Sequence, residues 1–227
     1  MYKYLLWDID GTVLNFLASE AYAIRTLFKE YNLGECTEEM LKQYSEINRK
    51  YWKMLERGEA SKPEILVGRF REFFELMGIN TAIAEDFNHD YQLSLGEYIE
   101  FIDNAEDILL STKGKYTLAA VTNGTKVAQE KKLRLSGLDK VFDAIFISED
   151  VGYEKPDVKY FDYVFKELGI TDKSEVVIIG DSLTSDMKGG YMAGIDTCWF
   201  NPNHAPNTLE IPVTYEIETL SELSDIL

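Results

Sequence analysis

Cysteine and histidine are scarce in this sequence, and their scarcity excludes several kinds of site. Among 227 residues there are two cysteines and two histidines. Cys36 and Cys198 are too few and too far apart for a disulfide framework or a cysteine zinc site, and we expect both to be reduced thiols. His89 and His204 offer neither a Ser-His-Asp arrangement nor a multi-histidine metal site. We therefore expect the chemistry of this protein to depend on other side chains.

Positive charge is also in short supply. The chain has 23 Lys and Arg residues against 40 Asp and Glu residues, a formal net charge of -17 and a pI near 4.5. This charge would repel a nucleic acid or an anionic membrane, so neither is expected as a partner. The net negative charge does not attract an anionic small molecule either, so a metal ion and local hydrogen-bond donors must hold any bound phosphate. Nothing in the sequence indicates an oligomeric state.

Long apolar runs are absent as well. The amino terminus acquires charge too early for a signal peptide, and no apolar stretch approaches membrane-spanning length. We therefore expect a cytoplasmic protein. Its 45% hydrophobic and 13% aromatic residues are nevertheless ample for a buried core.

Two parts of the chain differ in their hydrophobic pattern. Residues 17–95 carry apolar side chains at a spacing of three to four, which predicts consecutive helices and no strand. From residue 102 onward, helices and short apolar strands alternate, which indicates a parallel sheet covered on both faces. The predicted fold is α/β, with a parallel-sheet core of residues 1–16 and 97–227 and an inserted all-helical domain of residues 17–96. The predicted helices are 17–31, 38–57, 63–77, 82–95, 105–112, 126–136, 159–168, 185–193 and 219–227, and the predicted strands are 4–7, 116–121, 144–147, 176–179, 197–200 and 214–217.

Asp8 and Asp10 follow the first predicted strand at a spacing of two. Side chains of alternate strand residues project to the same side, so these two can share a site. An ionised Asp can attack phosphorus directly, whereas a neighbouring carboxyl crowded by like charge can keep a proton and act as a general acid. Gly11 would let the chain turn sharply, and Thr12 could orient the carboxylates by hydrogen bonding. The alternative interpretation is a turn with two solvated aspartates.

Two further turns carry potential phosphate-binding groups. Thr122, Asn123 and Gly124 lie between a predicted strand and a predicted helix, where a hydroxyl and unpaired backbone N–H groups can form an anion site. An ordinary strand-to-helix turn is the alternative. Lys155 precedes Pro156, which fixes the backbone and could aim the ammonium inward to neutralise a transferring phosphoryl group. A lone lysine in such a position is more often a solvated surface residue.

Two more carboxylates bracket the start of a predicted helix. Asp181 follows the most apolar predicted strand and Asp186 opens the next helix, which brings both side chains to one locus. Oxygen ligands of this kind suit Mg²⁺, which binds carboxylates, water and substrate phosphate. Asp186 could also stabilise the positive end of the helix dipole. Active sites of open parallel sheets form at the carboxyl ends of strands, so we expect all four polar segments to converge at one edge.

In order and spacing, these segments resemble the four motifs of the haloacid dehalogenase-like hydrolase superfamily. The segments are Asp8-Ile9-Asp10-Gly11-Thr12, Thr122, Lys155-Pro156 and Gly180-Asp181 through Asp186. The resemblance spans residues 3–200. It implies a Rossmann-like core, a helical cap inserted after the first motif, and hydrolysis with Mg²⁺ through an aspartyl-phosphate intermediate.

The resemblance also implies a role for each motif residue. Asp8 would be the nucleophile and a metal ligand, and Asp10 would be the acid/base and give its backbone carbonyl to the metal. Thr122 and Lys155 would hold the phosphoryl oxygens. Asp181 would bind Mg²⁺ directly. Asp186 would either bind Mg²⁺ directly or contact one of the groups that bind it.

One residue separates branches of this superfamily. The dehalogenases lack the second motif-one Asp, because displacing halide from carbon needs neither an acid nor a metal, so Asp10 favours phosphate-ester cleavage. Residues 147–156, 180–190 and 193–202 further resemble the pyrimidine nucleoside 5′-monophosphate phosphatases, and so does the insert beginning at residues 16–21 and containing Tyr51 and Trp52. This resemblance implies a small phosphorylated metabolite, a nucleoside monophosphate, as substrate.

Discrimination between leaving groups must come from surfaces that close over the phosphate site. Most aromatic side chains of the insert, such as Phe70, Phe73 and Phe74, are expected to pack its own core. Phe16, at the junction, is the best single candidate for contact with a nucleoside. The predicted substrate-binding residues are Thr12, Asn123, Gly124 and Phe16.

Three functions stay open at this point. The first is a Mg²⁺-dependent phosphomonoesterase acting on a nucleoside monophosphate, that is, a 5′-nucleotidase. The second is a sugar-phosphate or phosphoglycolate-type phosphatase, or a phosphoglucomutase, of the same superfamily. The third is a catalytically silent protein that binds a phosphorylated metabolite, and it is disfavoured because every motif position is filled.

Overall fold

A six-stranded parallel sheet forms the centre of one region of the protein. The computed structural model describes residues 1–227. The strands lie in the order β3-β2-β1-β4-β5-β6, and every neighbouring pair is parallel. Their bounds are β1 Tyr4–Trp7, β2 Thr117–Thr122, β3 Ala144–Ile147, β4 Val176–Gly180, β5 Asp196–Phe200 and β6 Tyr215–Ile217. β1 is therefore an interior strand, and its carboxyl end lies between those of β2 and β4.

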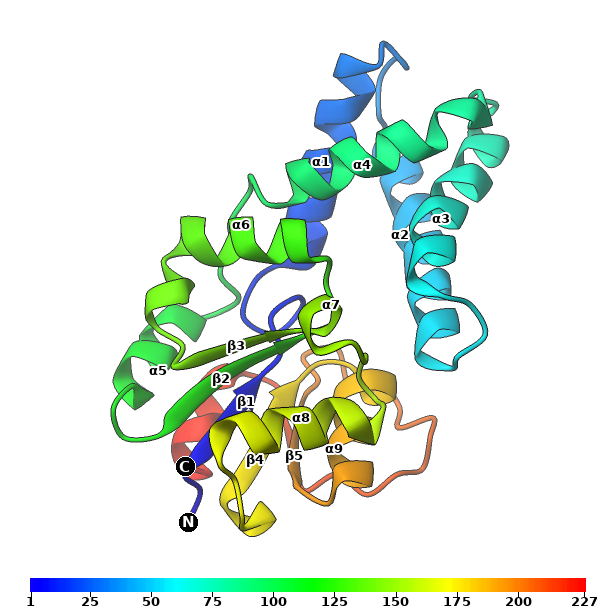
Figure 1. Ribbon diagram of the computed structural model, residues 1–227. Helices are drawn as coiled ribbons and strands as arrows, with labels where there is room; N and C mark the ends of the chain where they lie inside the picture. The colour runs from blue at the N-terminus through cyan, green and yellow to red at the C-terminus, as the bar shows by residue number, and fades with distance from the viewer.

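Helices cover both faces of this sheet (Figure 1). Leu5 and Trp7 belong to one hydrophobic cluster and Leu6 belongs to the other, because alternate strand residues project to opposite faces. The first cluster is completed by α5 (Ala105–Thr112), α6 (Lys126–Ser136) and the final 3₁₀ turn Leu220–Asp225. The second is completed by α7 (Ser148–Val151), α8 (Val158–Leu168) and α9 (Lys188–Ala193). Burial on both faces explains why the strands are continuous apolar runs.

The four helices that follow β1 form a separate bundle, here called the cap bundle. Their bounds are α1 Phe16–Glu30, α2 Glu38–Glu56, α3 Lys62–Met77 and α4 Ala84–Leu95. They enclose their own hydrophobic core, which is dominated by aromatic side chains. Asn15 and Thr37 cap α1 and α2 by accepting hydrogen bonds from backbone N–H groups of the first turns. No helix of the protein has both the length and the apolar character needed to cross a bilayer.

Several contacts join the cap bundle to the sheet region, and three hydrogen bonds among them lie near the carboxyl edge of the sheet. Thr184 donates a hydrogen bond to Glu56 at the end of α2. Lys62, at the start of α3, donates to Ser148 Oγ over 2.8 Å. Thr125, the N-cap residue of α6, donates to Gln92 Oε1 on α4 over 2.7 Å. The bundle is therefore docked against the loops at the carboxyl edge of the sheet.

The predicted α/β fold with a parallel sheet and an inserted all-helical bundle is confirmed. Three elements differ from the prediction. The short helix α7 was not expected, the closing helix is only the 3₁₀ turn Leu220–Asp225, and the helix expected at 185–193 begins earlier, with one π-helical turn, Leu183–Met187. Met187 N donates to Ser182 O in this turn, Ser182 Oγ caps it by accepting from Ser185 N, and Asp186 accepts from Ser182 N. The exact domain limits at residues 16/17 and 96/97 stay a prediction.

Candidate active site

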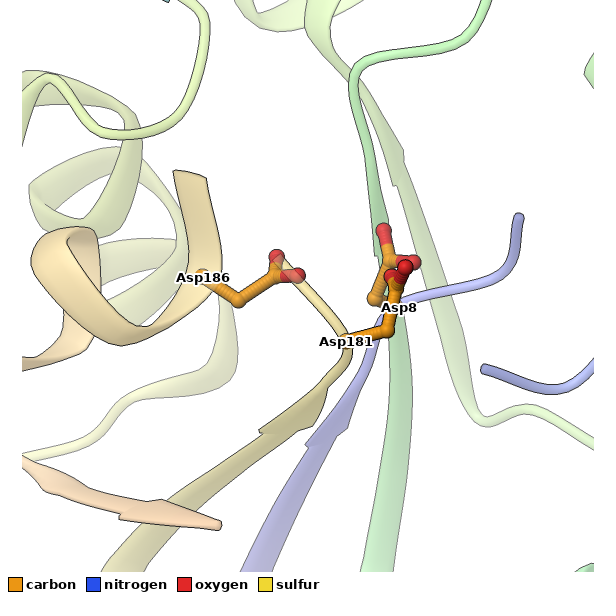
Figure 2. A group of neighbouring side chains, drawn as sticks. All are labelled: Asp8, Asp181 and Asp186. Carbon is orange, nitrogen blue, oxygen red and sulfur yellow. The ribbon is translucent and has the colours of Figure 1, made fainter. Parts of the chain in front are cut away.

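Three carboxylates converge at the carboxyl edge of the sheet. Asp8 follows β1, Asp181 follows β4, and Asp186 lies in the π-helical turn after β4. Figure 2 shows the three side chains directed toward one locus, and one oxygen from each lies within 4.8 Å of the others. Side chains far apart in sequence therefore meet because β1 and β4 are neighbours in the sheet.

Two glycines make this close approach of carboxylates sterically feasible. Gly11 has a φ of +97°, and a Cβ at this position would lie 2.7 Å from Asp181 Oδ2. A Cβ at Gly180 would likewise collide with the carboxylate of Asp186. The glycines of the first and last motifs are therefore required both by a left-handed turn at Gly11 and by the volume of the neighbouring carboxylates.

Lys155 is buried among these carboxylates, with 1% of its side chain exposed. Its ammonium donates to Asp8 Oδ1 over 2.8 Å, to Asp186 Oδ1 over 2.6 Å and to the carbonyl oxygen of Val121 over 2.7 Å. Asn123 fixes the lysine backbone, because its Nδ2 donates to Lys155 O over 2.8 Å and its Oδ1 accepts from Lys155 N over 2.9 Å. The lysine therefore points inward, and all three of its donor directions are used.

The carboxylates outnumber the cation that faces them. Burial raises the pKa of Asp8 to about 7, against the opposing charge of Lys155 and with a further increase from Asp186. Burial and then the charges of Asp8 and Asp186 raise the pKa of Asp181 well above its usual value. Burial alone would lower the pKa of Lys155, but Asp186 and Asp8 hold it above its ordinary value. Three clustered oxygen donors with one lysine leave an excess of negative charge, which fits a divalent cation with oxygen ligands.

Asp10 lies apart from this cluster. Its carboxylate accepts from Lys132 Nζ and from Gln129 Nε2, each over 2.5 Å, both on α6. Lys132 has 1% of its side chain exposed, and its ammonium lies 5.2 Å from the centre of the Phe16 ring. Asp10 faces the like charge of Asp8, as expected, but its carboxylate is also paired with a buried lysine, a pairing that was not predicted from the sequence. Lys132 carries no pattern that could have identified it, since it is one of several polar residues on α6.

The other predicted residues divide into buried and accessible groups. Thr12 is fully buried, and its hydroxyl lies 3.4 Å from both Asp8 Oδ2 and Asp181 Oδ1, so it lies against carboxylates rather than in the cavity. Thr122 Oγ1 accepts from Gly124 N over 3.1 Å. Thr122, Asn123 and Gly124 all line the cavity, so the turn after β2 reaches the same space as the carboxylates.

The cavity has a volume of about 180 Å³ and reaches from the sheet edge to the cap bundle. Its floor includes Asp8, Lys155 and Asp181, and Phe16 lies at its rim. The remaining lining residues are Asp10, Thr122, Asn123, Gly124, Ser182, Ser185, Asp186, Trp52 and Glu56. Trp52 and Glu56 come from α2. Phe70, Phe73 and Phe74 are fully buried in the core of the bundle, as expected. Glu56 was missed, because a glutamate on an exposed-looking helix carries no pattern of its own.

The parallel sheet, the acidic edge and the cavity beneath the cap bundle define an α/β protein with a site suited to a divalent metal and a phosphate group, and comparison with known proteins identifies the family. The family model for haloacid dehalogenase-like hydrolases matches residues 5–200, and the chain belongs to this family. The predicted superfamily is thus confirmed.

Several relatives match along the whole chain. HAD-hydrolase YfnB of Bacillus subtilis is 42% identical over 226 residues, covering 100% of this chain and 95% of the relative. Two relatives named pyrimidine 5′-nucleotidase are PynA of Streptococcus pneumoniae, 35% identical over 227 residues, and YjjG of Escherichia coli, 28% identical over 226 residues. Each covers 100% of this chain, and the chain covers 95% of PynA and 98% of YjjG.

One solved structure shares nearly the whole architecture. The crystal structure of YfnB bound to magnesium, described as revealing interdomain movement, superposes with a TM-score of 0.94 at 42% identity, covering 100% of this chain and 98% of that chain. The fold, the family and these relatives make the chain a phosphatase of this superfamily, a phosphoric monoester hydrolase.

Proposed function

We propose that this enzyme is a Mg²⁺-dependent phosphomonoesterase whose substrate is a pyrimidine nucleoside 5′-monophosphate. The observation that carries the proposal is the buried Lys155 bound to Asp8 and Asp186, with Asp181 beside them, at the floor of a cavity. PynA and YjjG support the substrate class, and the magnesium-bound YfnB crystal supports the metal.

In this proposal Asp8 attacks the phosphorus atom and carries the phosphoryl group as an aspartyl phosphate. Lys155 and the Thr122 hydroxyl hold phosphoryl oxygens as charge develops on them. The backbone of Gly124, in the turn before α6, would lie close to the same oxygens. Hydrolysis would thus take two steps, in which the bond between Asp8 and phosphorus first forms and is then broken by water.

The metal ion would be held by Asp8, Asp181, Asp186 and the backbone carbonyl of Asp10. Mg²⁺ would neutralise the excess carboxylate charge and orient the phosphate for attack. The side chain of Asp10 then has a separate role, as the acid that protonates the leaving-group oxygen and the base that activates the hydrolytic water. Its position between the cavity and Lys132 suits such a role.

The proposal includes a cap role for residues 17–96 and a cytoplasmic location. The cap bundle has its own hydrophobic core and contacts the sheet region through hydrogen bonds and through Ala128 of α6, which suits a unit that opens for substrate exchange. Cys36 and Cys198 are free, which agrees with a reducing compartment. Sugar-phosphate phosphatase activity is the second candidate, because the cavity floor recognises only the phosphate.

A phosphate-release screen tests the proposal. The purified chain is assayed with Mg²⁺ against pyrimidine and purine nucleoside monophosphates, sugar phosphates and acetyl phosphate. We expect the highest kcat/KM for a pyrimidine nucleoside 5′-monophosphate. A protein that releases no phosphate from any ester, although folded and metal-loaded, would instead be the silent binding protein.

A further inference from the structure

The cap bundle contributes one carboxylate to the wall of the cavity. Trp52 and Glu56 lie one helical turn apart on α2, and both line the space above Asp8 and Lys155. Because the phosphate must occupy the floor, the part of the substrate that faces α2 is the leaving group. Glu56 is therefore the one acidic side chain of the cap bundle that lines the cavity.

Glu56 is fixed in place without neutralisation by a cation. Its Oε2 accepts a hydrogen bond from the Thr184 hydroxyl, and its Oε1 accepts none from the protein. The adjacent Arg57 pairs with Glu59 instead. Burial raises the pKa of the Glu56 carboxyl group above its ordinary value, and the hydrogen bond from Thr184 opposes this increase. One carboxylate oxygen is thus left to interact with whatever enters the cavity.

We propose that Glu56 is a specificity-determining residue that selects for uncharged leaving groups carrying a hydroxyl or N–H donor. A carboxylate is an acceptor only, so it binds such a donor and repels a second anionic group on the substrate. Trp52 supplies an apolar ring beside it, on which a planar group can stack. This inference rests on the proposed phosphomonoesterase function and defines its substrate class.

Glu56 would separate the candidate substrates by the charge of their leaving groups. Nucleoside monophosphates and simple sugar monophosphates release a neutral alcohol, which Glu56 accepts. Phosphoglycolate releases an alcohol that carries a carboxylate, and a bisphosphate releases one that carries a second phosphate. Both would place like charge against Glu56 in a half-buried cavity, where repulsion is stronger than in water.

A matched pair of small substrates isolates this effect. 2-Hydroxyethyl phosphate and phosphoglycolate have nearly the same size and differ in a hydroxymethyl against a carboxylate group. We expect the wild-type kcat/KM to favour 2-hydroxyethyl phosphate by at least about tenfold, and Glu56→Gln to lower this ratio by at least about tenfold. Gln keeps the shape and an acceptor for Thr184. A ratio that Glu56→Gln leaves unchanged overturns the inference.

Two further variants keep the test decisive. Glu46→Gln removes one charge from an exposed position of the same helix and should leave the ratio unchanged, which separates a local effect from the net charge. Thr184→Val frees Glu56 and should reduce the ratio even if Glu56→Gln folds poorly. Acetyl phosphate serves as the reference substrate: its rate should change by less than about threefold in Glu46→Gln, and the rates of every variant on the small pair are compared with its own rate on acetyl phosphate.

Failure of the proposed function and failure of the Glu56 inference give different results. If nucleoside monophosphates are not hydrolysed but the small pair is discriminated through Glu56, the substrate proposal fails and this inference stands. If nucleoside monophosphates are hydrolysed and Glu56→Gln does not alter the ratio, the substrate proposal stands and the inference about Glu56 fails. Nucleoside 3′,5′-bisphosphate against nucleoside 5′-monophosphate repeats the comparison on larger leaving groups.

Discussion

The sheet region and the cap bundle each bury a cationic side chain, and they compensate its charge in different ways. Lys155 in the sheet region is bound by the carboxylates of Asp8 and Asp186. Arg69 in the cap bundle, which is 1% exposed, donates to the amide oxygens of Asn48 and Asn88, over 2.6 and 3.2 Å. The first arrangement concentrates charge that a substrate or metal can use. In the second, neutral amides separate the cation from a buried carboxylate, because Asn48 in turn donates to Glu20 over 2.7 Å.

The amides that bind Arg69 form part of a longer buried network. Its guanidinium also lies 5.1 Å from the Tyr91 ring centre. Asn88 accepts in turn from Gln92 Nε2 over 3.2 Å, and Gln92 Oε1 accepts from Thr125 in the sheet region. Buried polar side chains in the cap bundle therefore serve packing and docking, whereas those at the sheet edge serve chemistry. Mutations in the two regions should therefore separate stability from activity.

The largest effect is expected at the sheet edge, for Asp8→Asn. Removing the nucleophile should lower kcat by about 10⁴-fold or more on every ester. The melting temperature should stay within a few degrees, because the amide removes a like charge beside Asp181 and keeps an acceptor for Lys155. Phosphate release and thermal unfolding measure the two quantities. Residual activity within tenfold of wild type would contradict the nucleophile assignment.

Removing the metal should have the next largest effect. Stripping divalent ions and adding EDTA should reduce phosphate release by about 10³-fold, and Mg²⁺ should restore it, since the carboxylate excess otherwise repels the substrate. Mg²⁺ at 100 times its Kd should also stabilise the protein by about 2.7 kcal/mol. This stabilisation, followed by calorimetry, should shrink in Asp181→Asn. Undiminished activity after stripping would rule out the metal requirement.

Arg69→Met tests the other half of the comparison. It should lower the free energy of unfolding by about 3 kcal/mol, because the amide oxygens of Asn48 and Asn88 lose a buried donor. The kcat of the folded fraction on acetyl phosphate should change by less than about threefold. Denaturant unfolding and activity per folded molecule give these values. Arg71→Met, at an exposed position of the same helix, is the matched control. A large loss of kcat without loss of stability would break the comparison.

Lys132→Met should have an intermediate effect that depends on the ester. Lys132 positions Asp10, so its loss should reduce hydrolysis of alkyl phosphates by about tenfold to 100-fold, as Asp10→Asn also should, because alkyl leaving groups need a proton. Esters of acidic phenols should be less affected. Lys126→Met on the same helix is the control, since Lys126 pairs with Asp150. Equal losses on both ester types would argue against positioning of the acid.

Phe16→Ala should have the smallest effect. Phe16 lies at the rim of the cavity, and loss of its ring should lower kcat/KM for a nucleoside monophosphate by about tenfold, or 1.4 kcal/mol. Acetyl phosphate, which does not reach the cap bundle, should hardly respond. A parallel fall for both substrates would show that Phe16 acts through its contact with Lys132 and not on the substrate.

Most of the fold could be predicted from local patterns. The apolar runs at β1, β2 and β4 and the three-to-four spacing of α1 to α4 are set by residues near one another in sequence, so their positions follow within a few residues. The π-helical turn at Leu183–Met187 could not be predicted, because it depends on side-chain bonds made by Ser182 and Asp186 to backbone groups. Hydrophobic periodicity contains no record of such bonds.

The sequence by itself determined which residue types stand at the carboxyl ends of the strands, and therefore the family and the identity of Asp8, Lys155, Asp181 and Asp186. The tertiary structure alone decided their partners. It set Lys132 against Asp10 and brought Glu56 of the cap bundle into the cavity. The physical reason is range: strand formation and glycine turns are local and fix where a side chain starts. The pairing of Lys132 with Asp10 and the contact of Glu56 with Thr184 join residues more than 100 positions apart and depend on how α6 and α2 pack.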